Sequence, residues 1–281
     1  MTLSKKLIAE SFSKAATSYD AAAFLQKEVA DRVFERLDLM RVDPKLILDV
    51  GCGTGYCSRE LRDRFSRAKV YGIDIAPGMI KVAKNQQNLF RKINYQVADV
   101  DQLPFEDNQF DLVFSSLTIQ WLTDLKHTFK ELNRVLKPGG LVIFSTLGPD
   151  TLYELRDSWR EVDQGVHVNE FIDMHIVGDH VYNSHFDNTV MDRDVITMTY
   201  QTMIGLMRDL KAIGAHNIDS NRARGMLGKT KFKLLEKAYD KFRWKSGELP
   251  ATYEVVYGHA WKKHGEPSGD YHTYKVDPNR L

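Results

Sequence analysis

Cysteine is scarce in this sequence of 281 residues, and the two that it has, Cys52 and Cys57, lie in one glycine-rich segment. A disulfide framework needs more cysteines and an oxidising compartment, so both are predicted to be free thiols. The chain also lacks any run of about 18 apolar residues, which excludes a transmembrane helix. Its N-terminus lacks the apolar core and cleavage site of a signal peptide. We therefore expect a cytoplasmic protein that does not associate with membranes.

The sequence has little excess of charge of either sign. Its 39 Lys and Arg residues and 38 Asp and Glu residues leave a formal net charge of +1. A general nucleic-acid-binding protein is strongly basic, so nucleic acid is not an expected partner. Hydrophobic residues make up 43% of the chain and charged residues 27%, which is typical of a folded globular protein. The length allows one large domain, or one domain with an insertion.

Strand-like and helix-like segments alternate at short intervals between residues 45 and 147. The expected strands are residues 46–50, 70–74, 94–99, 110–116 and 141–147, and the expected helices begin near Tyr56, Gly78 and Asp124. Alternation of this kind, with nearly continuous apolar strands, predicts a parallel sheet covered by helices on both faces. The fold class is therefore predicted to be α/β.

The remaining segments define the predicted domain organisation. Residues 1–45 have helical spacing, and residues 46–149 form the alternating core. Residues 150–200 interrupt the alternation and are interpreted as an inserted cap, although the stretch 189–200 has the pattern of a strand. Residues 201–263 resume the core with two helices and a strong strand at 252–261, and residues 264–281 form a polar tail.

Three glycines mark the point where the first expected strand enters a helix. Gly51, Gly53 and Gly55 allow a sharp turn that approaches a ligand closely, although a tight strand–helix turn without a ligand has the same pattern. Asp74 ends the next strand, where a carboxylate binds both hydroxyls of a ribose; its alternative role is a helix N-cap. The turn therefore favours a nucleotide-type ligand once Asp74 is considered with it.

Asp99 and Val100 follow the third expected strand. The pair suits an adenine, with the carboxylate on the exocyclic amine and the apolar side chain beside the ring; a surface carboxylate is the alternative. Tyr56 stands where a dinucleotide fingerprint needs its third glycine, and the turn has no P-loop lysine. The sequence therefore predicts a single adenosine rather than a dinucleotide.

Five successive segments resemble the motifs of class I S-adenosylmethionine (SAM)-dependent methyltransferases. They are LDVGCGTG, GIDIAPGMI, ADVDQLPF, FDLVFSSLTIQW and LNRVLKPGGLVIFS. The resemblance implies a Rossmann-like fold with a seven-stranded, mostly parallel sheet whose last strand is antiparallel. It also implies SAM as the cofactor and S-adenosylhomocysteine (SAH) as the product. The cofactor-binding residues that we predict with it are Tyr19, Gln26, Asp49, Gly51, Cys52, Gly53, Gly55, Asp74, Ile75, Met79, Asp99, Val100, Ser116 and Leu117.

The resemblance assigns these residues to parts of the cofactor. Asp49 and the turn glycines hold the methionine end, and Asp74 holds the ribose. The adenine lies between Ile75 and Met79, with Asp99 and Val100 at its edge. Ser116 and Leu117 lie under the sulfonium.

The strand end FDLVFSSLTIQW, residues 110–121, has no nucleophile or base after Asp111. Thiol and carbon acceptors usually need a base within reach of the proton that they lose. A carboxylate ionises near pH 4 and needs none. The enzyme then has to supply proximity, alignment and partial desolvation. The strand end therefore favours a carboxylate as the methyl acceptor.

The rest of the chain resembles one subfamily, the malonyl-acyl-carrier-protein O-methyltransferases of biotin synthesis. The similar segments are FSKAATSYDAAAFLQKEVADRV, SLTIQW, STLGPDTLYELRDSWREVD, HVNEF, MRDLKAIGAHN and LPATYEVVYGHAWK. The resemblance implies that the free carboxyl of a malonyl thioester becomes a methyl ester. It also implies that residues 1–45 fold over the cofactor as a helical lid. The tail after Lys263 has no counterpart.

The residues expected at the acceptor are less strongly specified by the sequence. They are Tyr19, Gln120, Trp121, His167, Asn169 and Arg208. Tyr19 is expected to bring a hydroxyl near the transferred methyl, and Arg208 or neutral donors to hold the carboxylate. Each also has an ordinary alternative: a core tyrosine or tryptophan, a hydrogen-bonded loop residue, or a solvated charge. The spacing of the histidines around residues 175–185 does not suit a metal site.

An acidic carrier protein implies a basic docking surface on a protein that is expected to be a monomer. The candidate residues are Lys229, Lys231, Lys233, Lys237, Lys241 and Arg243, which also have the pattern of a solvated helix face. Two other functions stay open at this stage: a quinone-type or other small-molecule SAM methyltransferase, and a noncatalytic SAM-binding assembly factor.

Overall fold

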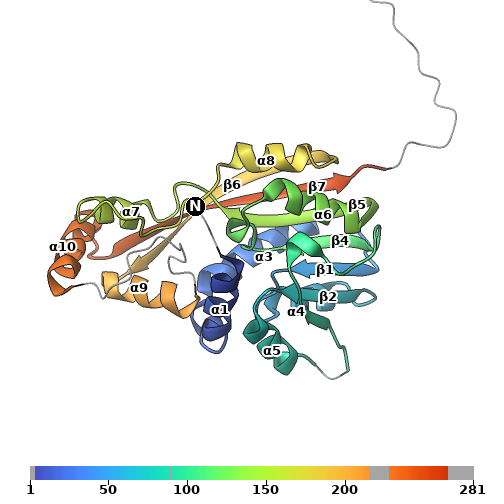
Figure 1. Cartoon of the computed structure of the whole chain (residues 1–281), viewed down its shortest axis with the longest axis horizontal. Coiled ribbons are helices and arrows are strands. Elements are labelled where there is room, and N and C mark those ends of the chain that lie inside the picture. The colour runs from blue at the N-terminus through green and yellow to red at the C-terminus, as the bar shows by residue number, and fades with distance from the viewer. Residues whose placement is uncertain (1–3, 89, 215–227, 265–281) are drawn as a thin grey trace, which may run out of the picture.

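The computed structural model describes residues 4–88, 90–214 and 228–264, and a single seven-stranded sheet runs through them (Figure 1). The strand order is β3-β2-β1-β4-β5-β7-β6. The strands are β1 (Leu46–Val50), β2 (Lys69–Asp74), β3 (Asn94–Val97), β4 (Phe110–Ser115), β5 (Leu136–Leu147), β6 (Phe186–Tyr200) and β7 (Leu249–Lys262). Strands β1 to β5 are parallel, and β7 is antiparallel to both of its neighbours. The predicted mostly parallel sheet with an antiparallel last strand is confirmed.

Helices lie on both faces of the sheet, as the continuous apolar strands require. They are α1 (Lys5–Ala15), α2 (Tyr19–Ala22), α3 (Phe24–Asp38), α4 (Tyr56–Arg64), α5 (Pro77–Gln86), α6 (Leu125–Val135), α7 (Tyr153–Arg160), α8 (Met174–Tyr182), α9 (Met203–Ala212) and α10 (Lys229–Tyr239). Three short 3₁₀ turns are η1 (Val100–Gln102), η2 (Ile119–Trp121) and η3 (Asp240–Phe242). Apolar side chains of α3, α4 and α5 bury one face of the sheet, and those of α6 and α8 bury the other.

The segment predicted to be a cap over residues 150–200 is smaller than expected. Residues 186–200 form β6, which pairs with β7 along its length at the edge of the sheet. Helix α8 packs on α6 and β6 through the buried Val177 and Val181, so it covers the sheet. The alternation of residues 189–200 is that of an edge strand with one covered face. The predicted cap was therefore wrong for residues 186–200, which belong to the sheet. The sequence did not reveal this pairing, because β6 is separated from its partner β7 by nearly 50 residues.

The N-terminal segment also divides into two parts. Helix α3 buries Val29, Val33 and Leu37 completely and belongs to the core of the sheet. Helix α1 packs on α5, and together with α2 it lies beside the strand ends that carry the predicted site (Figure 1). No helix in the described ranges is long and apolar enough to cross a bilayer. The tail predicted from residue 264 lies, after that first residue, outside the described residues.

Candidate active site

Three cavities adjoin one another at the carboxyl ends of β1, β2 and β4. The large cavity, about 750 Å³ including its open mouth, lies between Asp74, Asp99 and α1. The turn cavity, about 440 Å³, lies between the glycine turn and Gln26. The lip cavity, about 560 Å³, lies behind residues 116–121, which we call the lip, and reaches Asn169. In an open parallel sheet this edge is where ligands bind.

The glycine turn has the left-handed backbone that its sequence predicts. Gly51, Gly53 and Gly55 have φ values of 72°, 53° and 85°, a region that favours glycine. A Cβ on Gly51 would lie 2.0 Å from Oγ1 of Thr118, so the lip packs directly on this turn. The absence of side chains here lets β1 and β4 bring the turn and the lip together.

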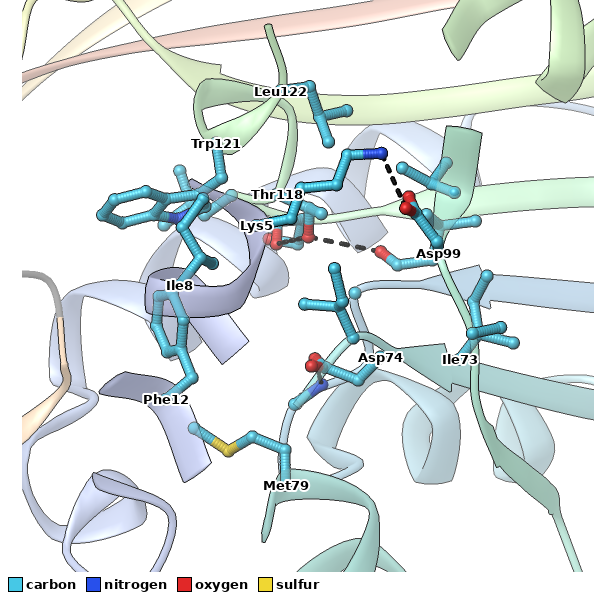
Figure 2. Close-up of a pocket in the computed structure, with 18 of the residues that line it drawn as sticks. Lys5, Ile8, Phe12, Ile73, Asp74, Met79, Asp99, Thr118, Trp121 and Leu122 are labelled. Carbon is cyan, nitrogen blue, oxygen red and sulfur yellow. Dashed lines mark hydrogen bonds and ion pairs between the residues drawn. The ribbon is translucent and has the colours of Figure 1, made fainter. Parts of the chain in front are cut away.

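Asp74 lines the large cavity and holds the turn in place (Figure 2). Its Oδ2 accepts a hydrogen bond from the Gly53 N–H at 2.9 Å, and its Oδ1 accepts one from the Ala76 N–H at 2.8 Å. Each carboxylate oxygen keeps a lone pair for another donor. Burial raises the pKa of Asp74 to about 6, against the effect of these two bonds. The remaining lone pairs suit the two hydroxyls of a ribose.

Asp99 has a partner that the sequence did not predict. Its Oδ2 accepts from Lys5 Nζ at 2.6 Å (Figure 2). The same ammonium lies 2.5 Å from Asp101. Lys5 belongs to α1 and lines the large cavity together with Ile8 and Phe12. Nothing in the local sequence indicates this contact, because it joins residues 94 positions apart.

The other residues predicted to touch an adenine or a sulfonium are brought together. Ile75, Met79, Val100, Ser116 and Leu117 all line the large cavity. Its walls are therefore mainly apolar, with Asp74 and Asp99 as the acidic groups that face it. This combination of an apolar slot and few polar groups is the usual form of a small-molecule site.

Asp49 lies beneath the turn, where it is almost completely buried, and it does not line these cavities. Its Oδ2 accepts a hydrogen bond of 2.5 Å from the Ser58 hydroxyl. Burial raises the pKa of Asp49 to about 7. The direct contact with the methionine end that we predicted for Asp49 is not supported by this position; Gln26, Cys52 and Gly53 line the turn cavity instead.

The raised pKa of Asp49 gives a stability prediction. Asp49 ionises near pH 4 in the unfolded chain and near pH 7 in the fold, so its stabilising contribution is complete below pH 4 and lost as the pH rises through 7. Asp49→Asn should therefore raise the free energy of unfolding of the cofactor-free protein at pH 8 by about 4 kcal/mol. Urea unfolding at pH 5 and 8 measures the effect, with the half-exposed Asp157→Asn as the control. A gain that is equal at both pH values would contradict the assignment.

Tyr19 lines all three cavities, and it is the point at which they meet. Its hydroxyl makes no hydrogen bond within the described part of the chain. Burial, together with the charge of Asp74, raises the pKa of Tyr19 well above its ordinary value, so the hydroxyl stays protonated. Gln26 lies beside it, lines the turn and lip cavities, and has a buried Oε1 without a hydrogen-bond partner among the described residues.

The lip cavity contains neutral polar groups on an apolar lining. Asn169 is only 9% exposed, and its Oδ1 has no partner among the described residues. Gln120 and Trp121 line the same cavity, so these three predicted residues are brought together. Thr151 and Phe171 also line it and were not predicted. No Lys, Arg, His, Asp or Glu is among the described residues that line this cavity.

Two predicted acceptor residues lie elsewhere. The His167 ring stacks on Trp159 with 3.5 Å between centroids, and its Nε2 lies 2.6 Å from Asp163. It anchors the loop that carries Asn169, a supporting role that the segment HVNEF does not reveal. Arg208 is exposed on α9 and lines none of the three cavities; Leu210, two residues further along, faces the lip cavity instead. The sequence places both residues near the site but does not show in which direction their side chains point.

Comparisons with known proteins agree on the family. A family model described as "Methyltransferase domain" matches residues 48–144. The chain is 46% identical over 266 residues to the malonyl-[acyl-carrier protein] O-methyltransferase of Gallionella capsiferriformans, covering 92% of this chain and 91% of that protein. It is 41% identical to the biotin biosynthesis bifunctional protein BioHC of Saccharophagus degradans, covering 89% of this chain and 45% of that protein.

Solved structures confirm the fold at low sequence identity. The chain superposes on the phosphoethanolamine N-methyltransferase 2 of Haemonchus contortus, solved with S-adenosyl-L-methionine, with a TM-score of 0.55 and 18% identity over 90% of this chain and 57% of that one. A methyltransferase complex from Haloferax volcanii gives a TM-score of 0.59 and 19% identity over 92% of this chain and 99% of that one.

The sheet order, the glycine turn and Asp74 at the end of β2 define a class I SAM-dependent methyltransferase. Its residues fit that cofactor, with free lone pairs on Asp74 and an apolar slot between Ile75 and Met79. Within this class, the chain belongs to the malonyl-[acyl-carrier protein] O-methyltransferase family. Among the described residues, no group of three or more His, Cys, Asp or Glu side chains is arranged to hold a metal ion.

Proposed function

We propose that this enzyme methylates the free carboxylate of a malonyl group carried by an acyl-carrier protein, as a step of biotin synthesis. The observation that carries the proposal is the lip cavity, which adjoins the cofactor site and has no titrating base or cation among its described lining residues. An acceptor that loses no proton needs no base. Family membership then supports malonyl as the particular carboxylate.

SAM, held at Asp74 and between Ile75 and Met79, would supply a methyl group whose carbon accepts the bond from an anionic oxygen as its bond to sulfur breaks, with SAH as the leaving group. The chain's own residues have to hold the carboxylate, aim one of its oxygens and remove water from around it. Tyr19, with a hydroxyl that stays protonated, lines all three cavities. The buried Asn169 also lines the lip cavity, and the nitrogen of its side-chain amide is the atom that can donate to a carboxylate. These two side chains are proposed to orient the acceptor.

Neutral donors suit this reaction better than a cation would. A carboxylate held in a tight ion pair with Arg or Lys has much of its charge neutralised, and its oxygen becomes a weaker nucleophile. Hydroxyl and amide donors fix the orientation and leave more negative charge on the attacking oxygen. Phe12 and Phe171 add apolar walls that partly desolvate it. The exposed position of Arg208 agrees with this arrangement.

The direct test uses radiolabelled SAM with malonyl-acyl-carrier protein, malonyl-coenzyme A and succinyl-acyl-carrier protein. The expected result is a labelled methyl ester on a malonyl thioester. The proposal fails if no malonyl thioester is labelled. Labelling of a quinone in a parallel reaction would identify the small-molecule alternative, and SAH binding without turnover on any acceptor would identify the assembly factor.

The proposed carrier-protein surface is the exposed side of α10. Lys229, Lys233 and Lys237 follow at four-residue spacing, so they lie on one face, and all three are exposed without ion pairs in the described ranges. The other predicted cations are already paired: Lys231 with Asp163, Lys241 with Glu161 and Arg243 with Asp240. The free positive charge is therefore concentrated in the first group.

Reversing these three charges should weaken the carrier-protein substrate selectively. We expect Lys229→Glu/Lys233→Glu/Lys237→Glu to raise KM for malonyl-acyl-carrier protein about tenfold at low salt, with KM for malonyl-coenzyme A unchanged. The matched control is Lys84→Glu/Lys126→Glu/Lys130→Glu, which makes the same change in net charge at exposed positions of α5 and α6. Equal effects of the two triple variants would place the docking surface elsewhere.

A further inference from the structure

Leu117 is held in a backbone conformation that its side chain disfavours. Its φ is 50°, in the left-handed region, and leucine visits this region rarely because its Cβ crowds the following carbonyl. Strain of this kind persists only where neighbouring groups enforce it, and it gathers at functional sites. Leu117 lines both the large cavity and the lip cavity. It therefore forms part of the wall between methyl donor and acceptor.

Hydrogen bonds on both sides of Leu117 enforce this conformation. Its N–H donates to the carbonyl oxygen and to Oγ of Ser145, both at 3.1 Å. Its carbonyl oxygen accepts from Nε2 of Gln120 at 2.7 Å. The other end of the Gln120 amide accepts from the Thr146 hydroxyl at 3.4 Å. Gln120 therefore links the strained residue to β5.

Gln120 was predicted from the sequence to shape the acceptor pocket, and it does line the lip cavity. Both ends of its amide, however, are engaged by the protein. We infer that Gln120 is a positioning residue: it holds Leu117 in the left-handed conformation and so fixes the wall between the cofactor and the acceptor. This role rests on the proposed function for its effect on turnover, but its effect on cofactor binding does not depend on the acceptor.

A double-mutant cycle separates positioning from substrate contact. Gln120→Met keeps the length of the side chain but cannot donate to Leu117, and it should lower SAH affinity about fivefold and kcat about tenfold. Glycine adopts left-handed backbone without strain, so Leu117→Gly should make Gln120 dispensable. In the Leu117→Gly background, Gln120→Met should change each quantity by less than about twofold. Gln201→Ala, at an exposed site, serves as the control in both backgrounds.

Gln120→Glu provides a second test, because a purely structural role of Gln120 predicts no change of relative activity with pH. An ionised Glu cannot donate to the Leu117 carbonyl, whereas a protonated Glu can. The activity of Gln120→Glu relative to the unmodified enzyme should therefore rise as the pH falls toward 5. The other titratable side chains that line the lip cavity are Tyr19 and Tyr253, and burial keeps both pKa values well above this range.

The outcomes of these tests are distinct. The positioning role would be overturned if Gln120→Met lowered SAH affinity and kcat as much in the Leu117→Gly background as in the original one. It would also be overturned if the activity of Gln120→Glu relative to the unmodified enzyme did not change with pH. Failure of the unmodified enzyme to methylate any malonyl thioester would overturn the proposed function instead. In that case the cycle on SAH affinity still decides the role of Gln120, because calorimetric binding of SAH needs no acceptor.

Discussion

Asp74→Asn is expected to lower the affinity for SAM and SAH about 100-fold or more, because both ribose hydroxyls lose a charge-assisted hydrogen bond. The change also disturbs the glycine turn. Asn has one acceptor oxygen, so the amide nitrogen would face either the Gly53 N–H or the Ala76 N–H, which are both donors. Isothermal titration with SAH measures the loss directly. Asp173→Asn, at the exposed N-cap of α8, is the matched control because Asn is an equally good cap.

The same carboxylate predicts a pH dependence of cofactor binding. The pKa of Asp74 is raised to about 6 by burial. Below that pH the group is protonated in the cofactor-free protein and loses its charge-assisted bonds to the ribose. SAH affinity should therefore fall as the pH is lowered through 6, and Asp74→Asn should abolish most of this dependence. Retention of near-normal affinity in Asp74→Asn would show that the ribose is held elsewhere.

Tyr19→Phe is expected to lower kcat about 10- to 100-fold, because it removes a neutral donor to a charged acceptor. SAH affinity should change by less than about threefold, since the aromatic ring that lines the large cavity remains. Steady-state kinetics with malonyl-acyl-carrier protein and titration with SAH separate the two quantities. Tyr182→Phe, 69% exposed on α8, controls for the loss of a hydroxyl at an unrelated position.

A rise in KM with unchanged kcat would give Tyr19 a different role from the one proposed. It would mean that the hydroxyl binds the acceptor equally in the ground state and the transition state. A parallel loss of SAH affinity would mean that Tyr19 belongs to the cofactor site alone. Because Tyr19 lines all three cavities, its substitution can affect cofactor binding and acceptor turnover, and the two measurements distinguish these effects.

The cofactor half of the site could be predicted from the sequence because its determinants are local. Gly51, Gly53 and Asp74 act through backbone turns and strand ends, and both features follow from short-range pattern. The acceptor half depends on distant pairing. His167 and Asn169 are two residues apart in the loop, yet one stacks on Trp159 and the other faces the lip cavity. No periodicity of the sequence distinguishes their directions.

Longer-range contacts were less predictable still. The bond of Lys5 to Asp99 depends on how α1 crosses the strand ends, and the edge position of β6 depends on its partner β7. The left-handed Leu117 was not predicted either, because leucine gives no local signal for that conformation. These features arise from tertiary packing, which overrides the local preference of each residue.

Helix α1 lines both the large cavity and the lip cavity, and this has a consequence for the kinetics of substrate exchange. Lys5 pairs with the Asp99 carboxylate, and Phe12 lines both the large and the lip cavity, with its ring centroid 5.2 Å from that of Trp121. If α1 acts as the predicted lid, its movement would open the large cavity and the lip cavity together. We then expect exchange of the cofactor and access of the acceptor to be coupled through this one helix.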